Sequence, residues 1–95
     1  MKNYEFPEKC PAYLKQDYYD TIRRFLTKGI NPGQFMTAVL SNNLMDAMAR
    51  ADEETVGDLK SITMFIYNDV PGMCHGTRAK VSEWLQGGHR EYDHG

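Results

Sequence analysis

Apolar residues recur at helical spacing in four segments of the chain, and turn residues separate the segments. In the first segment, 12–28, one face carries the apolar side chains of Leu14, Tyr18, Ile22, Phe25 and Leu26. Residues three or four apart lie on one side of an α-helix, so this spacing predicts an amphipathic helix. Similar stripes predict helices over 32–50, 53–68 and 78–86. Four helices with short connections indicate an all-α fold, either a compact array or a bundle.

The two ends of the chain differ from this helical middle. Residues 1–11 hold Tyr4, Phe6 and two prolines without a helical period, so we expect an extended N-terminal arm whose rings pack on the body. A length of 95 residues favours a single domain, which would cover 12–86. Residues 87–95 begin with two glycines and are expected to form a flexible tail.

The stretch TKGINPGQF, residues 27–35, predicts a corner between the first two helices. Asn31 suits the N-cap of the second helix, Pro32 its first position, and Gln34 completes a capping box. Gly33 is not required by these caps, and glycine inside a helix costs about 0.5–1 kcal/mol relative to alanine. A close approach by another backbone, a neighbouring subunit or a ligand would explain Gly33.

Polar residues on or beside the second predicted helix form another candidate group. Asn43 lies three residues after Leu40 and therefore points toward the apolar side. An unpaired buried amide costs roughly 1–3 kcal/mol, so Asn43 is expected either to fix the helix arrangement or to bind a ligand. Arg50 and Asp52 flank the next corner. Two interpretations stay open there, an ion pair between them or an anion bound by Arg50.

Basic and aromatic residues gather near the end of the first predicted helix. Arg23 and Arg24 are adjacent, and Lys28 lies one turn beyond Arg24. Tyr19 precedes Arg23 by one turn. Guanidinium groups bind phosphate and an aromatic ring can stack on a base, so this set is typical of a site for a nucleotide-like anion. The same residues also fit an ordinary solvated helix surface.

Composition and charge narrow the class of partner. A net charge of −2 argues against a general nucleic-acid or membrane-surface binder. The apolar runs are far shorter than the roughly 18 residues that span a bilayer. The start of the chain has no apolar signal core, so we expect a cytoplasmic protein whose two cysteines are thiols. A chain this short buries only roughly 60–65% of its unfolded surface, and we therefore expect a homo-oligomer.

No stretch of the chain carries a catalytic or cofactor motif. Neither the phosphate-cradling G-x-x-x-x-G-K-[ST] nor a strand-led G-x-G-x-x-G is present. Cys74 and His75 are adjacent, a placement that rarely allows a hydrogen bond between the two side chains, and no acid orients them. His89 and His94 fall in the predicted tail and fit no zinc-ligand spacing. We expect no catalytic residue, no metal and no cofactor.

Two blocks of the chain carry a distinctive pattern. Residues 29–52 follow G-I-x-P-G-x-F-x-x-A-V-L-x-N-x-L-x-x-A-x-x-R-A-D, and residues 71–84 follow P-x-x-C-x-G-[ST]-x-x-K-V-x-x-W. The two blocks resemble a family of small, mostly uncharacterised proteins encoded by tailed bacteriophages. The resemblance does not include the N-terminal arm or the first predicted helix. It departs from the family at His75, where a large aromatic residue is expected.

The resemblance implies a phage accessory protein, and such proteins often blunt host defence or redirect the host cell. We therefore expect a non-enzymatic binding protein in the host cytoplasm that sequesters a nucleotide second messenger in an oligomeric sponge. The alternative is an inhibitor that docks directly on a host defence nuclease or enzyme through the acidic region 46–60. A helix-turn-helix DNA reader is disfavoured because the third helix is too apolar for a groove. The expected ligand-binding residues are Tyr19, Arg23, Arg24, Lys28, Gly33, Asn43 and Arg50.

Overall fold

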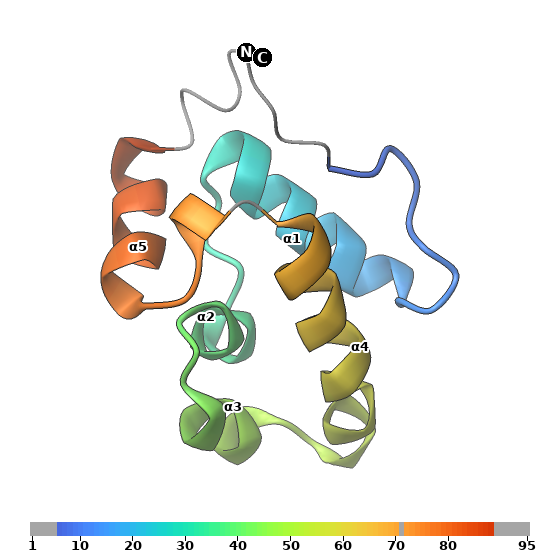
Figure 1. The fold of residues 1–95 in the computed structure, drawn as a ribbon. Helices are drawn as coiled ribbons and strands as arrows, with labels where there is room; N and C mark the ends of the chain where they lie inside the picture. The colour runs from blue at the N-terminus through green and yellow to red at the C-terminus, as the bar shows by residue number, and fades with distance from the viewer. Residues whose placement is uncertain (1–5, 71, 89–95) are drawn as a thin grey trace.

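The computed structural model describes residues 6–70 and 72–88, and every regular element within them is helical (Figure 1). The helices are α1 (Gln16–Lys28), α2 (Gln34–Leu40), α3 (Leu44–Arg50), α4 (Glu53–Asp69) and α5 (Arg78–Glu83). A 3-10 turn covers Gly72–Cys74, and a π-helical turn, Trp84–Gly88, continues from α5. The predicted all-α class is confirmed. The helix boundaries differ from the prediction in several places.

The first difference is at the start of α1, which begins four residues later than predicted. The amide of Leu14 donates to the carbonyl of Pro11 at 3.1 Å, so the chain makes a turn there instead of a helix. The far end agrees with the prediction. Gly29 takes the left-handed conformation at φ 64°, and its amide donates to Phe25. Glycine adopts this conformation without a Cβ clash, and it therefore closes the helix.

The second difference is that the predicted helix 32–50 is two helices. The chain breaks at Asn42, whose φ is 62°, and the amide of Asn43 bonds back to the carbonyl of Ala38 at 2.8 Å. Asn43 then caps α3 by accepting from the amide of Asp46 at 3.1 Å. Serine and asparagine side chains compete with helical hydrogen bonds and favour caps and turns, so three of them in a row end α2.

The start of α2 also corrects the predicted capping. The N-cap is Gly33 and not Asn31, and the helix begins at Gln34. Asn31 accepts instead from the amide of Gly33 at 2.8 Å. Gly33 has φ 93°, a conformation that side chains rarely adopt, and no atom lies within 4 Å of the place where its Cβ would be. Backbone conformation therefore accounts for this glycine, and no close approach is needed.

Side-chain caps begin α4 and α5, and both cap residues are of types that favour this position. Asp52 accepts from the amide of Thr55 at 2.8 Å, and Thr77 accepts from the amide of Lys80 at 3.1 Å. Acidic residues in the first turn of α4 suit the positive end of its dipole. A further difference is that α5 ends at Glu83 and a π-helical turn follows it; the helical backbone is interrupted at Gly87, whose φ is 152°.

The core lies where α1, α4 and the C-terminal turns meet. Its largest fully buried side chains are Phe25, Phe65, Ile22, Leu26, Leu40, Ile62, Val81 and Cys74. Trp84 joins the C-terminal segment to α1, because its indole N–H donates to the carbonyl of Phe25 at 3.0 Å. The indole is thus buried with its one polar group satisfied, as the burial of a tryptophan requires.

The described part of the N-terminal segment packs on this core. Phe6 stacks on Tyr19 with ring centroids 5.3 Å apart and meets Phe65 edge-on at 5.5 Å. The hydroxyl of Tyr19 donates to the carbonyl of Pro7 at 2.6 Å. The predicted packing of arm rings is therefore present at Phe6. Tyr4 and residues 89–95 of the predicted tail lie outside the described residues.

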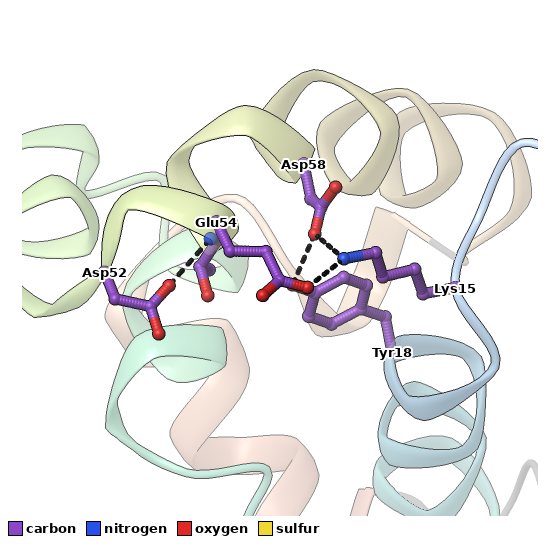
Figure 2. A network of polar contacts seen from close by, with 6 residues as sticks. Lys15, Tyr18, Asp52, Glu54 and Asp58 are labelled. Atoms are coloured by element: carbon purple, nitrogen blue, oxygen red, sulfur yellow. Dashed lines mark hydrogen bonds and ion pairs between the residues drawn. The ribbon is translucent and has the colours of Figure 1, made fainter.

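A polar network ties the start of α1 to the first turns of α4 (Figure 2). Lys15 forms ion pairs with Glu54 and, at 2.9 Å, with Asp58. The hydroxyl of Tyr18 donates to the same Asp58 carboxylate at 2.9 Å. Hydrogen bonds from Lys15 and then Tyr18 lower the pKa of Asp58, while burial raises the pKa of Tyr18. The carboxylate is therefore held in its charged form.

The left-handed residue at the α2–α3 break predicts a contrast between two substitutions. Asn42→Ala should lower the free energy of unfolding by about 1 kcal/mol, because alanine tolerates positive φ less well than asparagine. Asn42→Gly should leave it nearly unchanged, since glycine adopts positive φ without a clash. Urea unfolding followed by circular dichroism measures both. Equal losses in the two variants would show that the side chain matters and the backbone conformation does not.

The network in Figure 2 predicts how the fold responds to acid. The pKa of Asp58 is lower in the folded protein than its ordinary 3.8. Its stabilising effect is therefore present above that ordinary value and is lost as the pH falls below it. Asp58→Asn should show a smaller drop in melting temperature than the unsubstituted protein on going from about pH 5 to about pH 3. Asp17→Asn, which changes net charge equally, should keep the original drop, and a matching drop in Asp58→Asn would contradict this account.

Candidate functional site

The structure separates the residues of the basic and aromatic set expected on α1. Tyr19 is buried, with 3% of its surface exposed, and Phe6 stacks on its ring. The prediction that Tyr19 stacks on a ligand is therefore corrected, because its ring is part of the core. Arg23, Arg24 and Lys28 are exposed, and none forms an ion pair within the described part of the chain. They make an open basic strip on the exposed side of α1.

A polar hollow of about 280 Å³ lies between α2, α3 and the start of α5. It is lined by Asn31, Gln34, Thr37, Ala38, Ser41, Asn43, Asp46, Arg50 and Arg78. The break at Asn42 turns α3 beside α2 and so brings the two short helices to the same hollow. Two of the expected ligand residues, Asn43 and Arg50, are in its wall. Gly33 lies in sequence between the lining residues Asn31 and Gln34.

Arg50 is held in place from two helices. Its Nε donates to both carboxylate oxygens of Asp46, each at 3.2 Å, one turn earlier on α3. Its Nη1 donates to Oε1 of Gln34 on α2 at 2.5 Å. Gln34 therefore binds Arg50 and does not complete a capping box. The ion pair that Arg50 makes is with Asp46, while Asp52 serves as the cap of α4.

Two hydroxyl groups in the wall of the hollow have no hydrogen-bond partner. Thr37 Oγ1 and Ser41 Oγ are both inaccessible to solvent and unpaired within the described residues. Thr37 is on α2, and Ser41 is the C-cap residue that follows it four positions later, so the two lie on the same side of the helix. An unsatisfied buried hydroxyl costs about 1–3 kcal/mol, and the wall of this hollow carries two of them.

Arg78 adds a second guanidinium from a third helix. It is exposed at the first position of α5 and forms no hydrogen bond or ion pair with any described residue. The charges in the lining are those of Arg50, Arg78 and Asp46, which sum to one net positive charge. Guanidinium groups with neighbouring amides and hydroxyls are the donors that bind phosphate or carboxylate oxygens.

The ionisable groups of the lining are two arginines and one aspartate. It includes no cysteine, histidine or lysine, and its one carboxylate, that of Asp46, accepts from Arg50. Cys74 and His75 lie elsewhere. Burial raises the pKa of Cys74 to about 12, and His75 Nε2 lies 3.2 Å from the carbonyl of Val70. No three His, Cys, Asp or Glu side chains within 6–70 and 72–88 are grouped to hold a metal ion.

A second, more apolar hollow of about 250 Å³ lies on the other side of the α2–α3 link. Val39, Leu40, Asn42, Thr63, Ile66, Tyr67, His75 and Gly76 line it. Tyr67 on α4 is 81% exposed, so its ring is open to a ligand in a way that the ring of Tyr19 is not. An apolar hollow edged by an aromatic ring and a few polar groups can accept a planar ring system.

Of the residues that line the polar hollow, the sequence predicted only Asn43 and Arg50 as ligand-binding; it gave Asn31 and Gln34 a role in capping and gave no role to Thr37, Ser41, Asp46 or Arg78. Thr37 and Ser41 stand four apart between apolar positions, a spacing that places both hydroxyls on one helix face. That signal was available in the sequence. No sequence signal marked Asp46 or Arg78 as lining residues, because the hollow depends on a break in the predicted helix and on the approach of α5.

Searches of protein-family models, of curated proteins and of solved structures found no match for this chain. The resemblance to the phage family therefore stays a prediction. Within the described residues, no helix combines the length and the apolar character that crossing a bilayer requires.

The unpaired hydroxyl of Thr37 predicts that one substitution raises the stability of the fold and weakens ligand binding. Thr37→Val should raise the free energy of unfolding by about 1 kcal/mol, because a methyl group of the same shape replaces a buried group without a partner. The same variant should bind an oxyanion more weakly, since it loses a hydrogen-bonding group in the wall. Thr63→Val is the contrast for the stability effect alone, and it should not gain stability, because Thr63 is exposed and its hydroxyl donates to the carbonyl of Leu59 at 2.6 Å. Urea unfolding of both variants checks the first effect, and a loss of stability in Thr37→Val would contradict it.

Proposed function

We propose that this protein binds a small anionic, nucleotide-like ligand and does not transform it. The observation that carries the proposal is the polar hollow, which Arg50 and Arg78 line together with Thr37 and Ser41, two residues whose buried hydroxyls lack partners. The two guanidinium groups would bind an oxyanion in the hollow, and a side-chain rotation of Thr37 or Ser41 would bring an unpaired hydroxyl from behind the wall to the same anion. The apolar hollow is a separate place, and the open ring of Tyr67 there supports binding of a planar base.

The wider role we propose is sequestration. The resemblance to phage accessory proteins supports a protein that withholds a nucleotide second messenger from a host defence effector, as a sponge in the host cytoplasm. An oligomer suits this role because several copies raise the binding capacity of one particle. The outer face of α3 supports such association, since Leu44 and Met45 are 63% and 84% exposed. Exposed apolar side chains on one helix face favour burial against another protein surface.

The same face of α3 favours the alternative function, an inhibitor that docks on a host defence protein. Met48 extends the apolar face, and exposed Glu53 follows at the start of α4. Methionine side chains adapt to varied partner surfaces, and an acidic rim suits a protein with a basic nucleic-acid channel. The two functions differ in what the purified protein retains, a small molecule for the sponge and a host protein for the inhibitor.

Calorimetry against cyclic oligonucleotides and ADP-ribose derivatives tests the binding proposal. Arg78→Gln should weaken binding of the active compound by roughly 10- to 100-fold, which is the usual worth of a charge-assisted hydrogen bond. Arg78 has no partner among the described residues, so its loss should leave the fold intact. Arg23→Gln, which removes the same charge from α1, is the matched control and should bind as the unsubstituted protein does.

Two other outcomes would count against this proposal. If Arg23→Gln loses affinity and Arg78→Gln keeps it, the ligand lies on the basic strip of α1 and not in the polar hollow. If a folded sample is silent across the whole panel and a pull-down from infected cells retains a stoichiometric host protein, the inhibitor replaces the sponge.

A further inference from the structure

Asp46 is a carboxylate in the wall of a hollow that otherwise offers cations and neutral hydrogen-bonding groups. Its side chain is 36% exposed, and both of its oxygens accept from Arg50 Nε at 3.2 Å. A bound anion in the hollow would therefore lie close to a negative charge. An acid at this place needs an explanation, because it opposes the two arginines that attract the ligand.

A role of Asp46 in stabilising α3 does not explain its place in the wall. An exposed ion pair between residues four apart on a helix contributes little to stability. Arg50 is also held by Gln34 from α2, so its position does not depend on Asp46 alone. Asp46 instead changes the charge of the hollow. The charged groups facing it are Asp46 and Arg50 from α3 and Arg78 from α5, and α2 contributes neutral side chains.

The net charge of the wall decides which anion fits best. The attraction between the wall and an anion grows in proportion to the charge of the anion, while the cost of removing the anion from water grows with the square of that charge. A wall with one net positive charge therefore suits an anion with one negative charge. A doubly charged anion costs more to desolvate and leaves a negative charge uncompensated. Without Asp46 the wall would carry two net positive charges and would suit a doubly charged anion.

We infer that Asp46 is a specificity-determining residue, which makes the polar hollow select singly charged oxyanions, such as a phosphodiester, over doubly charged ones, such as a phosphate monoester. The inference rests on the proposed function, because it assumes that the hollow binds an anion. It adds the charge class of the ligand and the residue that sets it.

Two small probes isolate the effect of charge. Dimethyl phosphate carries one negative charge, and methyl phosphate carries close to two at pH 7.5, because the second pKa of a phosphate monoester is about 6. Each is titrated into the full-length ¹⁵N-labelled chain, and the NMR signals of the side-chain amides of Asn31 and Asn43 report binding in the hollow. Asp46→Asn should strengthen binding of dimethyl phosphate roughly threefold and binding of methyl phosphate roughly tenfold, because removing one charge acts twice as strongly on a dianion.

Control variants separate charge from shape. Asn keeps an oxygen that can accept from Arg50, so Asp46→Asn removes the charge with little change in geometry. Asp46→Glu keeps the charge and should keep the original ratio of the two affinities. Glu8→Gln changes the net charge of the chain equally but lies in the N-terminal segment, and it should also keep that ratio. Dispersed amide signals establish that each variant is folded.

The outcomes distinguish this inference from the proposed function. If Asp46→Asn strengthens both probes equally or neither, the hollow is an anion site but Asp46 does not set its charge class, and the inference is overturned. If Asp46→Asn does not fold, the affinity ratio in the unsubstituted protein decides, and tighter binding of methyl phosphate than of dimethyl phosphate overturns the inference. If neither probe moves the two amide signals in the unsubstituted protein, the proposed site itself is wrong and the inference falls with it.

Discussion

The backbone of Asn42 stands at φ 62°, and the chain reverses there between two helices of seven residues each. An asparagine adopts this conformation more readily than other residues that carry a Cβ, because its short polar side chain finds local partners. The reversal places Asn43 and α3 beside the Thr37 side of α2. A continuous helix would carry Arg50 away from Gln34, and the polar hollow would not exist. Its geometry therefore depends on one backbone conformation.

The polar hollow is built at a cost that the rest of the fold must offset. Two buried hydroxyls without partners are unfavourable, and Arg50 is ordered by contacts from two helices. The compensation lies in the core, where α1 and α4 bury large apolar side chains and Trp84 satisfies its indole N–H on Phe25. Groups that weaken the folded state while lining a cavity are common at binding sites, since the ligand supplies what the protein leaves unpaired.

Local chemistry made part of this structure predictable from the sequence. Asp52 and Thr77 cap their helices and Gly29 closes α1, because caps depend only on residues a few positions away. The apolar spacing gave the helical class but hid the break at Asn42, since Leu40 and Leu44 continue one stripe across it. Contacts distant in sequence were not predictable. Phe6 from the N-terminal segment covers Tyr19, so this expected ligand residue is buried in the core. Arg78 reaches the hollow from α5, and the sequence did not predict it as a site residue.

Cys74 is fully buried in the core, and burial raises the pKa of its thiol to about 12. Alkylating reagents attack thiolates, so this sulfur stays unreactive for as long as the surrounding side chains enclose it. Each molecule in which the reagent reaches Cys74 has opened at least once. Cys74 is thus a native probe of core opening, because its rate of modification reports how often a molecule exposes its interior under native conditions.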